Sequence, residues 1–569
     1  MKTPAMKRLW SRRAVPWTRC WIAMACATAA AAAAGEDVSL RLETDDPVAI
    51  VRADRPEDAR FVLTNEDSQD LEGTLRLAAS ERPEGAPIHE TETDLAVAAD
   101  AYVTVDIPAE FFEQQGMLYI AWAFDVNGED GWSGETALAH MDPVGVTPEI
   151  QAGPHQGGAE FILGIAGGIR HHWDSALKRR FLEAAAIIGC EAYRMDMSWN
   201  ALQPDPDTWN WDGLDEVVDA AADLGMFIQP LMAYGVEWAL SDDMRRRIEE
   251  AEDHAHHWRY PPRLEPWREF NRAVAERYGT RMQYYEIWNE PDIDFFKGTA
   301  EEYLALLQAA YGAIKEENPE IIVTTAGFTA LDHPRLDTEL VPLVLEEGQD
   351  YFDAIAWHRH GPFPGFQNEV DNALLPLLAE HGLEDAPLVF NETALGRPFH
   401  QEWDLAAQLV KKMSLTWARG AFGHYWYNLT RSAPNYQMVN EDWTPRPSYP
   451  AYNAFARLLR GREFSHEVDL GSGRWAFAFR GAGHFTGQGA ESWVMTAWTE
   501  DEASPEEAFT LEAAPGAEAC AVDLMGNRRK LPVDGQGRVT FTPGHDPSYV
   551  VIEGAGALGG AAAPANTED

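Results

Sequence analysis

The sequence predicts an α/β protein with a central (β/α)8 TIM barrel and a β-sandwich domain on either side. Two observations lead to this fold. Within residues 155–459, apolar runs typical of strands alternate with amphipathic stretches typical of helices. Before and after this region the helical pattern is missing, and short strand-like runs are separated by turn residues. A closed parallel barrel accounts for the first pattern, and β-sandwiches account for the second.

Residues 1–34 have the pattern of a secretory signal peptide. A basic start precedes an alanine-rich apolar run from Trp21 to Ala34, which is too short to span a membrane as a helix. We expect cleavage near Ala34 and a secreted or periplasmic protein. A lipoprotein is a less favoured alternative, because the residues before Cys26 make a poor lipobox. No other run is apolar enough to cross a membrane.

The two flanking regions read as β-sandwiches. Residues 36–145 contain alternating runs such as DVSLRLET and AYVTVDI, separated by turns, as in an immunoglobulin-like sandwich. Residues 462–553 contain a second set, including RWAFAFRG and SYVVIEG. The Gly- and Ala-rich tail, 554–569, is predicted to be disordered.

The barrel prediction depends on eight strand candidates. A doubly wound open sheet is the rival fold, but no candidate is followed by the glycine-rich phosphate loop that such sheets often carry. The candidates, in chain order, are FILGIAGG, EAYRMDM, MFIQPLMA, MQYYEIW, IIVTTAG, FDAIAWH, PLVFNET and FGHYWYNL.

The net charge limits the classes of binding partner, and the cysteine content limits disulfides and metal sites. The formal net charge is −47, which disfavours binding to nucleic acids and anionic membranes. The same long-range field disfavours polyanionic sugars. Outside the first 34 residues only Cys190 and Cys520 remain, so we expect neither a disulfide framework nor a cysteine metal site.

Two glutamates follow strands that face each other across the predicted barrel. Glu290, in YYEIWNEP, ends the fourth strand candidate, and Glu392, in PLVFNET, ends the seventh. Reactive groups of such barrels sit at the carboxyl ends of the strands. Cleavage of a glycosidic bond needs two carboxyl groups, one to protonate the leaving oxygen and one to attack or support the anomeric carbon. The pair therefore predicts a glycosidase.

The same segments resemble glycoside hydrolase clan A, and most closely family 39 and its relatives. The motif EIWNEPD on strand four and the glutamate on strand seven carry the resemblance, together with YRMDMSWNALQPDPDTWNWDG and TPRPSYPAYNAFARLL. The likeness extends over roughly residues 161–459. It implies cleavage with retention of anomeric configuration, with Glu290 as acid/base and Glu392 as nucleophile.

The resemblance also implies roles for other side chains. Asn289 would hold the 2-hydroxyl of the sugar, and Arg194, at the end of strand two, would orient the nucleophile. Trp426, on strand eight, would form the floor of the site and stack under the sugar. Alternation places Trp426 on one strand face with His424, and Tyr425 on the other. The remaining substrate-binding candidates are His172, Tyr234, His358 and His360.

Strand six differs from a common clan pattern, His-x-Tyr. This chain has His358-Arg359-His360, so His360 stands where a tyrosine usually contacts the nucleophile. We expect a neutral His360 to donate one N–H to Glu392. The alternative is that His358 is the donor and His360 binds substrate, since residues two apart share a strand face.

The function predicted is hydrolysis of a poly- or oligosaccharide by double displacement, without a cofactor or metal. One alternative is a transglycosylase that uses the same site. Another is a glycan-binding protein without catalytic activity, which the presence of both glutamates disfavours. The partner expected in each case is a carbohydrate.

Overall fold

The computed structural model describes residues 37–126, 129–145, 161–396, 401–431, 436–483, 492–500, 508–553 and 559–562. They divide into two compact units. One unit holds residues up to 45, 55–113 and 118–138, and the other holds 46–54, 114–117 and everything from 139 onward. The predicted signal peptide, residues 1–34, lies outside the described residues. No described helix has the length and apolar character needed to cross a membrane.

The N-terminal region consists of β-strands, as predicted. They form a three-stranded sheet in the order β1-β3-β6 and a five-stranded sheet in the order β2-β8-β7-β4-β5. The strands are β1 (Val38–Glu43), β2 (Ile50–Arg52), β3 (Arg60–Asn65), β4 (Leu71–Ser80), β5 (His89–Val97), β6 (Ala101–Asp106), β7 (Gly116–Val126) and β8 (Glu129–Met141).

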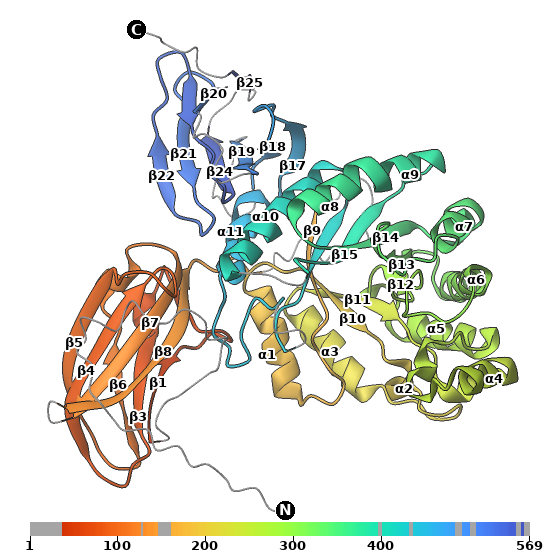
Figure 1. The fold of residues 1–569 in the computed structure, drawn as a ribbon, viewed down its shortest axis with the longest axis horizontal. Helices are drawn as coiled ribbons and strands as arrows, with labels where there is room; N and C mark the ends of the chain where they lie inside the picture. Colours follow the sequence, from red (N-terminus) through yellow and green to blue (C-terminus); the bar gives the residue numbers. More distant parts are fainter. Residues whose placement is uncertain are drawn as a thin grey trace, which may run out of the picture. The chain divides into compact units, whose positions relative to one another are not determined.

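Eight parallel strands close into a barrel, which confirms the predicted fold class. Each strand candidate of the sequence forms one of them. The barrel closes where the last strand pairs with the first. Figure 1 labels the barrel strands from β9 to β15. The strands are β9 (Ile162–Ala166), β10 (Ala192–Asp196), β11 (Phe227–Met232), β12 (Tyr285–Ile287), β13 (Val323–Phe328), β14 (Ala354–His360), β15 (Leu388–Ala394) and β16 (Gly423–Tyr427).

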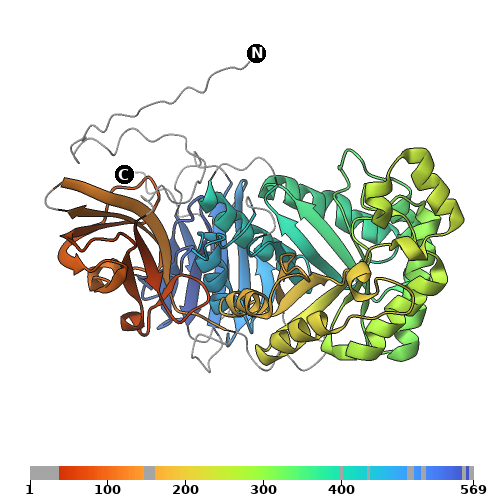
Figure 2. The ribbon, with the colours of Figure 1, turned by 90° about the horizontal axis from the view of Figure 1, so that it is seen from below.

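Helices surround these strands, and Figure 2 shows the yellow-green to green ones standing outside the barrel. Local signals start several of them: Asp174 caps the first, and Thr299 with Glu302 forms a capping box before α6. The helices are α1 (Ser175–Ala186), α2 (Trp199–Leu202), α3 (Asp212–Asp223), α4 (Asp242–Ala251), α5 (Leu264–Tyr278), α6 (Ala300–Glu317), α7 (Leu340–Glu347), α8 (Phe363–Glu369), α9 (Leu375–Glu380), α10 (Glu402–Ala418) and α11 (Ser448–Leu459).

Apolar side chains fill the interior of the barrel. The cluster includes Ile162 of β9, Val389 of β15 and Tyr425 of β16. A Cβ on Gly164 would lie 2.3 Å from the Tyr425 ring, so this position of β9 accepts only glycine. This apolar cluster fills the barrel below the carboxyl ends of the strands. The polar site lies above it, at the strand ends.

The C-terminal region is a second β-rich part, as predicted. Its sheets run β17-β18-β19-β24-β21-β22 and β23-β20-β25, and side chains of both sheets share one core. The predicted disorder of the tail is wrong for residues 559–562, which pair with β20. The strands are β17 (Glu463–Glu467), β18 (Arg474–Gly481), β19 (Ser492–Thr499), β20 (Phe509–Glu512), β21 (Glu518–Val522), β22 (Arg528–Leu531), β23 (Arg538–Phe541), β24 (Ser548–Glu553) and β25 (Gly559–Ala562).

Candidate active site

Glu290 stands just beyond the end of β12 on a sharply turned backbone. Trp288 and Glu290 both have positive φ, 74° and 43°, which is uncommon for residues other than glycine. The turn is held by backbone bonds from Trp288 N to Met232 O and from Glu290 N to Gly327 O. The neighbouring strands β11 and β13 therefore fix the position of Glu290. Left-handed backbone at such a place is frequent in functional sites.

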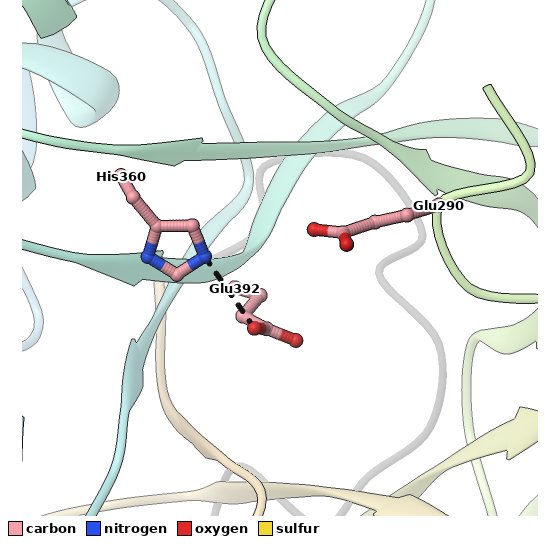
Figure 3. Close-up of side chains that lie close together, drawn as sticks. All are labelled: Glu290, His360 and Glu392. Atoms are coloured by element: carbon pink, nitrogen blue, oxygen red, sulfur yellow. Dashed lines mark ion pairs between the residues drawn. The ribbon is translucent and has the colours of Figure 1, made fainter. Parts of the chain in front are cut away.

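Glu392 lies within β15, opposite His358 of β14 in the strand register. Its side chain keeps 16% of its surface exposed, whereas that of Glu290 keeps 10%. One carboxylate oxygen of each glutamate and one ring nitrogen of His360 all lie within 4.8 Å of one another. Figure 3 shows the three side chains converging on one space, His360 from β14, Glu392 from β15 and Glu290 from the turn after β12.

Arg194 of β10 connects the residues at the base of the site. Its Nη1 donates to Glu392 at 2.8 Å, and its Nη2 donates to the side-chain oxygen of Asn289 at 2.7 Å. Glu286 of β12 accepts two further hydrogen bonds from the same guanidinium, at 2.5 and 2.9 Å. One buried cation thus orients the carboxylate of Glu392 and the amide of Asn289.

The two histidines of β14 contact different glutamates. His358 Nδ1 lies 2.9 Å from Glu290 Oε1, while His360 Nε2 lies 3.5 Å from Glu392 Oε1 (Figure 3). A Cβ on Gly327 would lie 2.0 Å from His358 Nε2, so glycine in β13 makes room for this imidazole. His360 therefore lies next to Glu392, as expected, whereas His358 contacts Glu290.

Burial and charge push the two carboxyl groups toward opposite protonation states. Burial, and then the charge of Glu392, raise the pKa of Glu290 to about 7. Burial alone would also raise the pKa of Glu392. The nearby His358, the His360 hydrogen bond and Arg194 outweigh burial and hold that pKa well below its ordinary value. Below about pH 7 the site therefore holds an ionised Glu392 and a protonated Glu290.

Glu290, His360 and Glu392 also have the residue types of a metal site. Two features oppose a bound cation at this place. Arg194 already donates to Glu392 from 2.8 Å, and its positive charge repels a second cation. The raised pKa of Glu290 means that a metal ion would have to displace its proton near neutrality.

The remaining predicted residues differ in where they lie. Tyr234 follows β11, and burial, followed by the charge of Asp196, holds the pKa of its phenol well above the ordinary value. His172 is exposed on the loop after β9. Among the described residues no hydrogen bond or ion pair connects His172 to either glutamate.

Two expected substrate contacts are corrected. Trp426 is fully buried, and its ring lies near Lys412 of α10 rather than in the open site. The alternation along β16 is as predicted, but the inward face belongs to Tyr425 and Tyr427. His358 is also fully buried, so it acts on Glu290 rather than on a substrate.

The sequence alone did not identify three residues that lie near Glu290 and Glu392. Glu286 holds Arg194, and Tyr427 is half-buried with its ring 6.4 Å from that of His360. Asp196 ends β10 two residues after Arg194, and burial raises its pKa to about 6. Strand alternation was the available signal for Asp196, since it shares a face with Arg194.

The fold is shared with solved glycoside hydrolases. A family 39 glycoside hydrolase from the gut symbiont Bacteroides cellulosilyticus WH2 has a TM-score of 0.63 and 17% identity, over 90% of this chain and 100% of that chain. A glucosidase from Croceicoccus marinus has a TM-score of 0.50 and 12% identity, over 70% of this chain and 98% of that chain. No protein-family model and no curated protein matches the sequence. At these identities the comparison shows the fold alone, and this is the barrel fold that the resemblance to clan A predicted.

Proposed function

We propose that the protein is a retaining glycoside hydrolase. The observation that carries the proposal is the pair Glu290 and Glu392, whose closest carboxylate oxygens lie within 4.8 Å and whose pKa values are displaced in opposite directions. Retaining enzymes hold the two groups about 5–5.5 Å apart, and inverting enzymes hold them about 6.5–9.5 Å apart to admit a water. The separation favours direct attack by a carboxylate.

The reaction proceeds in two steps. A Glu392 oxygen bonds to the anomeric carbon while the glycosidic bond breaks, and Glu290 gives its proton to the leaving oxygen. In the second step Glu290, now ionised, takes a proton from water. The water oxygen bonds to the anomeric carbon and releases Glu392. Each half of the cycle thus restores the protonation state that the other half needs.

The surrounding side chains have supporting roles in this scheme. Arg194 and His360 keep Glu392 ionised and oriented. Arg194 also holds the amide oxygen of Asn289, which leaves the amide N–H groups for a sugar hydroxyl. Tyr427 takes the place that the sequence suggested for Trp426, beside the sugar ring. His172 and Tyr234 stay candidates for contacts to hydroxyl groups.

The test is a screen of aryl glycosides and polysaccharides, followed by proton NMR of the first product formed from the best substrate. We expect hydrolysis with the product in the anomeric configuration of the substrate. An inverted product contradicts the two-step route. A product extended by one sugar, with little free sugar, indicates the transglycosylase alternative. Binding without turnover by the intact chain indicates the catalytically silent alternative.

We also propose that the protein is exported. The support is the signal-peptide pattern of residues 1–34, a basic start followed by an alanine-rich apolar run. Mass spectrometry of the protein recovered from culture supernatant or periplasm tests this. An N-terminus near residue 35 is expected, and an uncleaved protein confined to the cytoplasm contradicts it.

A further inference from the structure

Three aromatic rings from three different segments meet beside the acid/base candidate. Tyr234 follows β11, Trp258 belongs to the 3-10 segment η6 (His254–Arg259), and Phe295 lies in the turn after Glu290. The Tyr234 and Trp258 rings are 4.8 Å apart, Trp258 and Phe295 are 6.1 Å apart, and Tyr234 and Phe295 are 6.4 Å apart. All three side chains are partly exposed. We call these three residues the aromatic wall.

Backbone hydrogen bonds hold the aromatic wall in place. Gly235 N donates to Trp258 O at 2.9 Å, and Lys297 N donates to Arg259 O at 2.8 Å. A Cβ on Gly235 would lie 2.5 Å from Tyr260 O, so a glycine permits this close approach. The buried Trp288 fixes the third member, because its indole N–H donates to Phe295 O. The wall is therefore anchored to both β11 and the turn that carries Glu290.

The aromatic wall stands on the Glu290 side of the site. The barrel order places β11 next to β12, which leads to Glu290, and diametrically opposite β15, which carries Glu392. The Tyr234 ring also packs against Trp288, two residues before Glu290, with 5.6 Å between the ring centres.

We propose that the aromatic wall is the subsite for the leaving group, and that it takes a group with a flat apolar face. A second sugar ring and an aromatic alcohol both present such a face. This inference rests on the proposed function, in which Glu290 protonates the leaving oxygen, so that the departing group must lie next to Glu290. Partly exposed Tyr and Trp rings offer apolar area at low entropic cost, because they have few rotatable bonds.

The experiment compares one sugar carried on three leaving groups: a second sugar, a substituted phenol and fluoride. Fluoride has no ring to stack and needs no proton from Glu290. For Trp258→Ala we expect kcat/KM to fall roughly 3- to 30-fold on the first two substrates, in line with the loss of one ring contact. On the fluoride we expect no change beyond about 2-fold. A fall on only one of the first two substrates identifies which leaving group the wall takes.

Two further variants complete the design. Phe295→Leu keeps an apolar side chain but removes the ring, and the same selective loss is expected. Trp209→Ala removes a half-buried ring that stacks on Trp211 at 4.7 Å in the loop before α3, and should leave all three rates unchanged.

Equal losses on all three substrates for both Trp258→Ala and Phe295→Leu overturn the assignment, as does no loss on any of them. If the unaltered protein cleaves none of the three substrates, the proposed function itself is contradicted. This outcome differs from the two above, in which the unaltered protein is active.

Discussion

Glu286 accepts hydrogen bonds from one edge of the Arg194 guanidinium, from Nε at 2.5 Å and from Nη2 at 2.9 Å, in a buried pair. Bidentate pairing fixes the plane of a guanidinium. The remaining Nη1 then points at Glu392. Glu286 also accepts the backbone N–H of Gly327, whose carbonyl receives the N–H of Glu290. The surroundings of both proposed catalytic carboxyl groups therefore depend on one buried carboxylate that touches neither of them.

Replacing Glu286 by glutamine should move the alkaline limb of the pH profile. The negative charge of Glu286 is one of the influences that raise the pKa of Glu290, after burial and Glu392. Without that charge the pKa of Glu290 falls, so kcat/KM should begin to decline at a lower pH than in the unaltered protein.

The matched control is Glu369→Gln. It removes another buried carboxylate that pairs with an arginine, Arg359 at 3.2 Å, and binds the Trp357 indole. An alkaline limb that stays in place in Glu286→Gln, or moves equally in Glu369→Gln, contradicts the role given to Glu286.

The pH profile of the unaltered protein follows from the two displaced pKa values. Glu290 must be protonated for the first step and has its pKa raised to about 7, so kcat/KM should fall as the pH rises through about 7. Glu392 must be ionised and has its pKa held below the ordinary value, so the acid limb should lie below about pH 4.5. In Glu290→Gln, assayed on a substrate with a good leaving group, the alkaline limb should disappear. Its persistence would assign that limb to another residue.

His360→Phe should lower turnover by roughly 10–1000-fold, as expected for the loss of one positioned donor. Loss of the N–H also raises the pKa of Glu392, so the acid limb should move to higher pH. His360→Tyr should restore much of the activity, because a phenol O–H reaches a similar place. Kinetics of the three proteins from acid to alkaline pH test this. Equal activity of the Phe variant and the unaltered protein would remove His360 from the mechanism.

Tyr427 and Trp426 should respond in different ways to replacement by alanine. Tyr427 is half-buried beside His360, so its loss should raise KM or lower kcat with a small effect on stability. Trp426 is fully buried against α10, and its loss should cost about 3–5 kcal/mol of unfolding free energy. Urea unfolding and steady-state kinetics of both variants separate the two effects. Large losses of activity in a stable Trp426 variant would restore the original assignment.

The barrel was predictable because each strand candidate is a short apolar run followed by an amphipathic helix. The same regularity placed Glu290 and Glu392, since strand ends of a parallel barrel share one rim. The face of β16 that turns inward was not predictable. Helices cover the outside of the barrel, so its strands are buried on both faces. The run His424, Tyr425, Trp426 and Tyr427 therefore shows no alternation of polar and apolar residues that would tell the outer face from the inner one.

The roles of residues that act through contacts between strands also could not be predicted from the sequence. Glu286 lies four residues before Glu290 in the same motif, but only the closed barrel brings Arg194 of β10 to it. His358 and His360 stay equivalent by alternation, and the pairing of β14 with both of its neighbours shifts register along the strand. Side-chain positions of this kind follow from strand register, which local pattern does not specify.

Covalent trapping tests the central claim most directly. A 2-deoxy-2-fluoro glycoside of the sugar found in the screen, with a good leaving group, slows release of the intermediate more than its formation. After peptide digestion and mass spectrometry, we predict the sugar attached as an ester to Glu392, and no attachment in Glu392→Gln. Attachment to any other residue, or rapid turnover with inversion and no attached sugar, would contradict the assignment of Glu392 as the nucleophile.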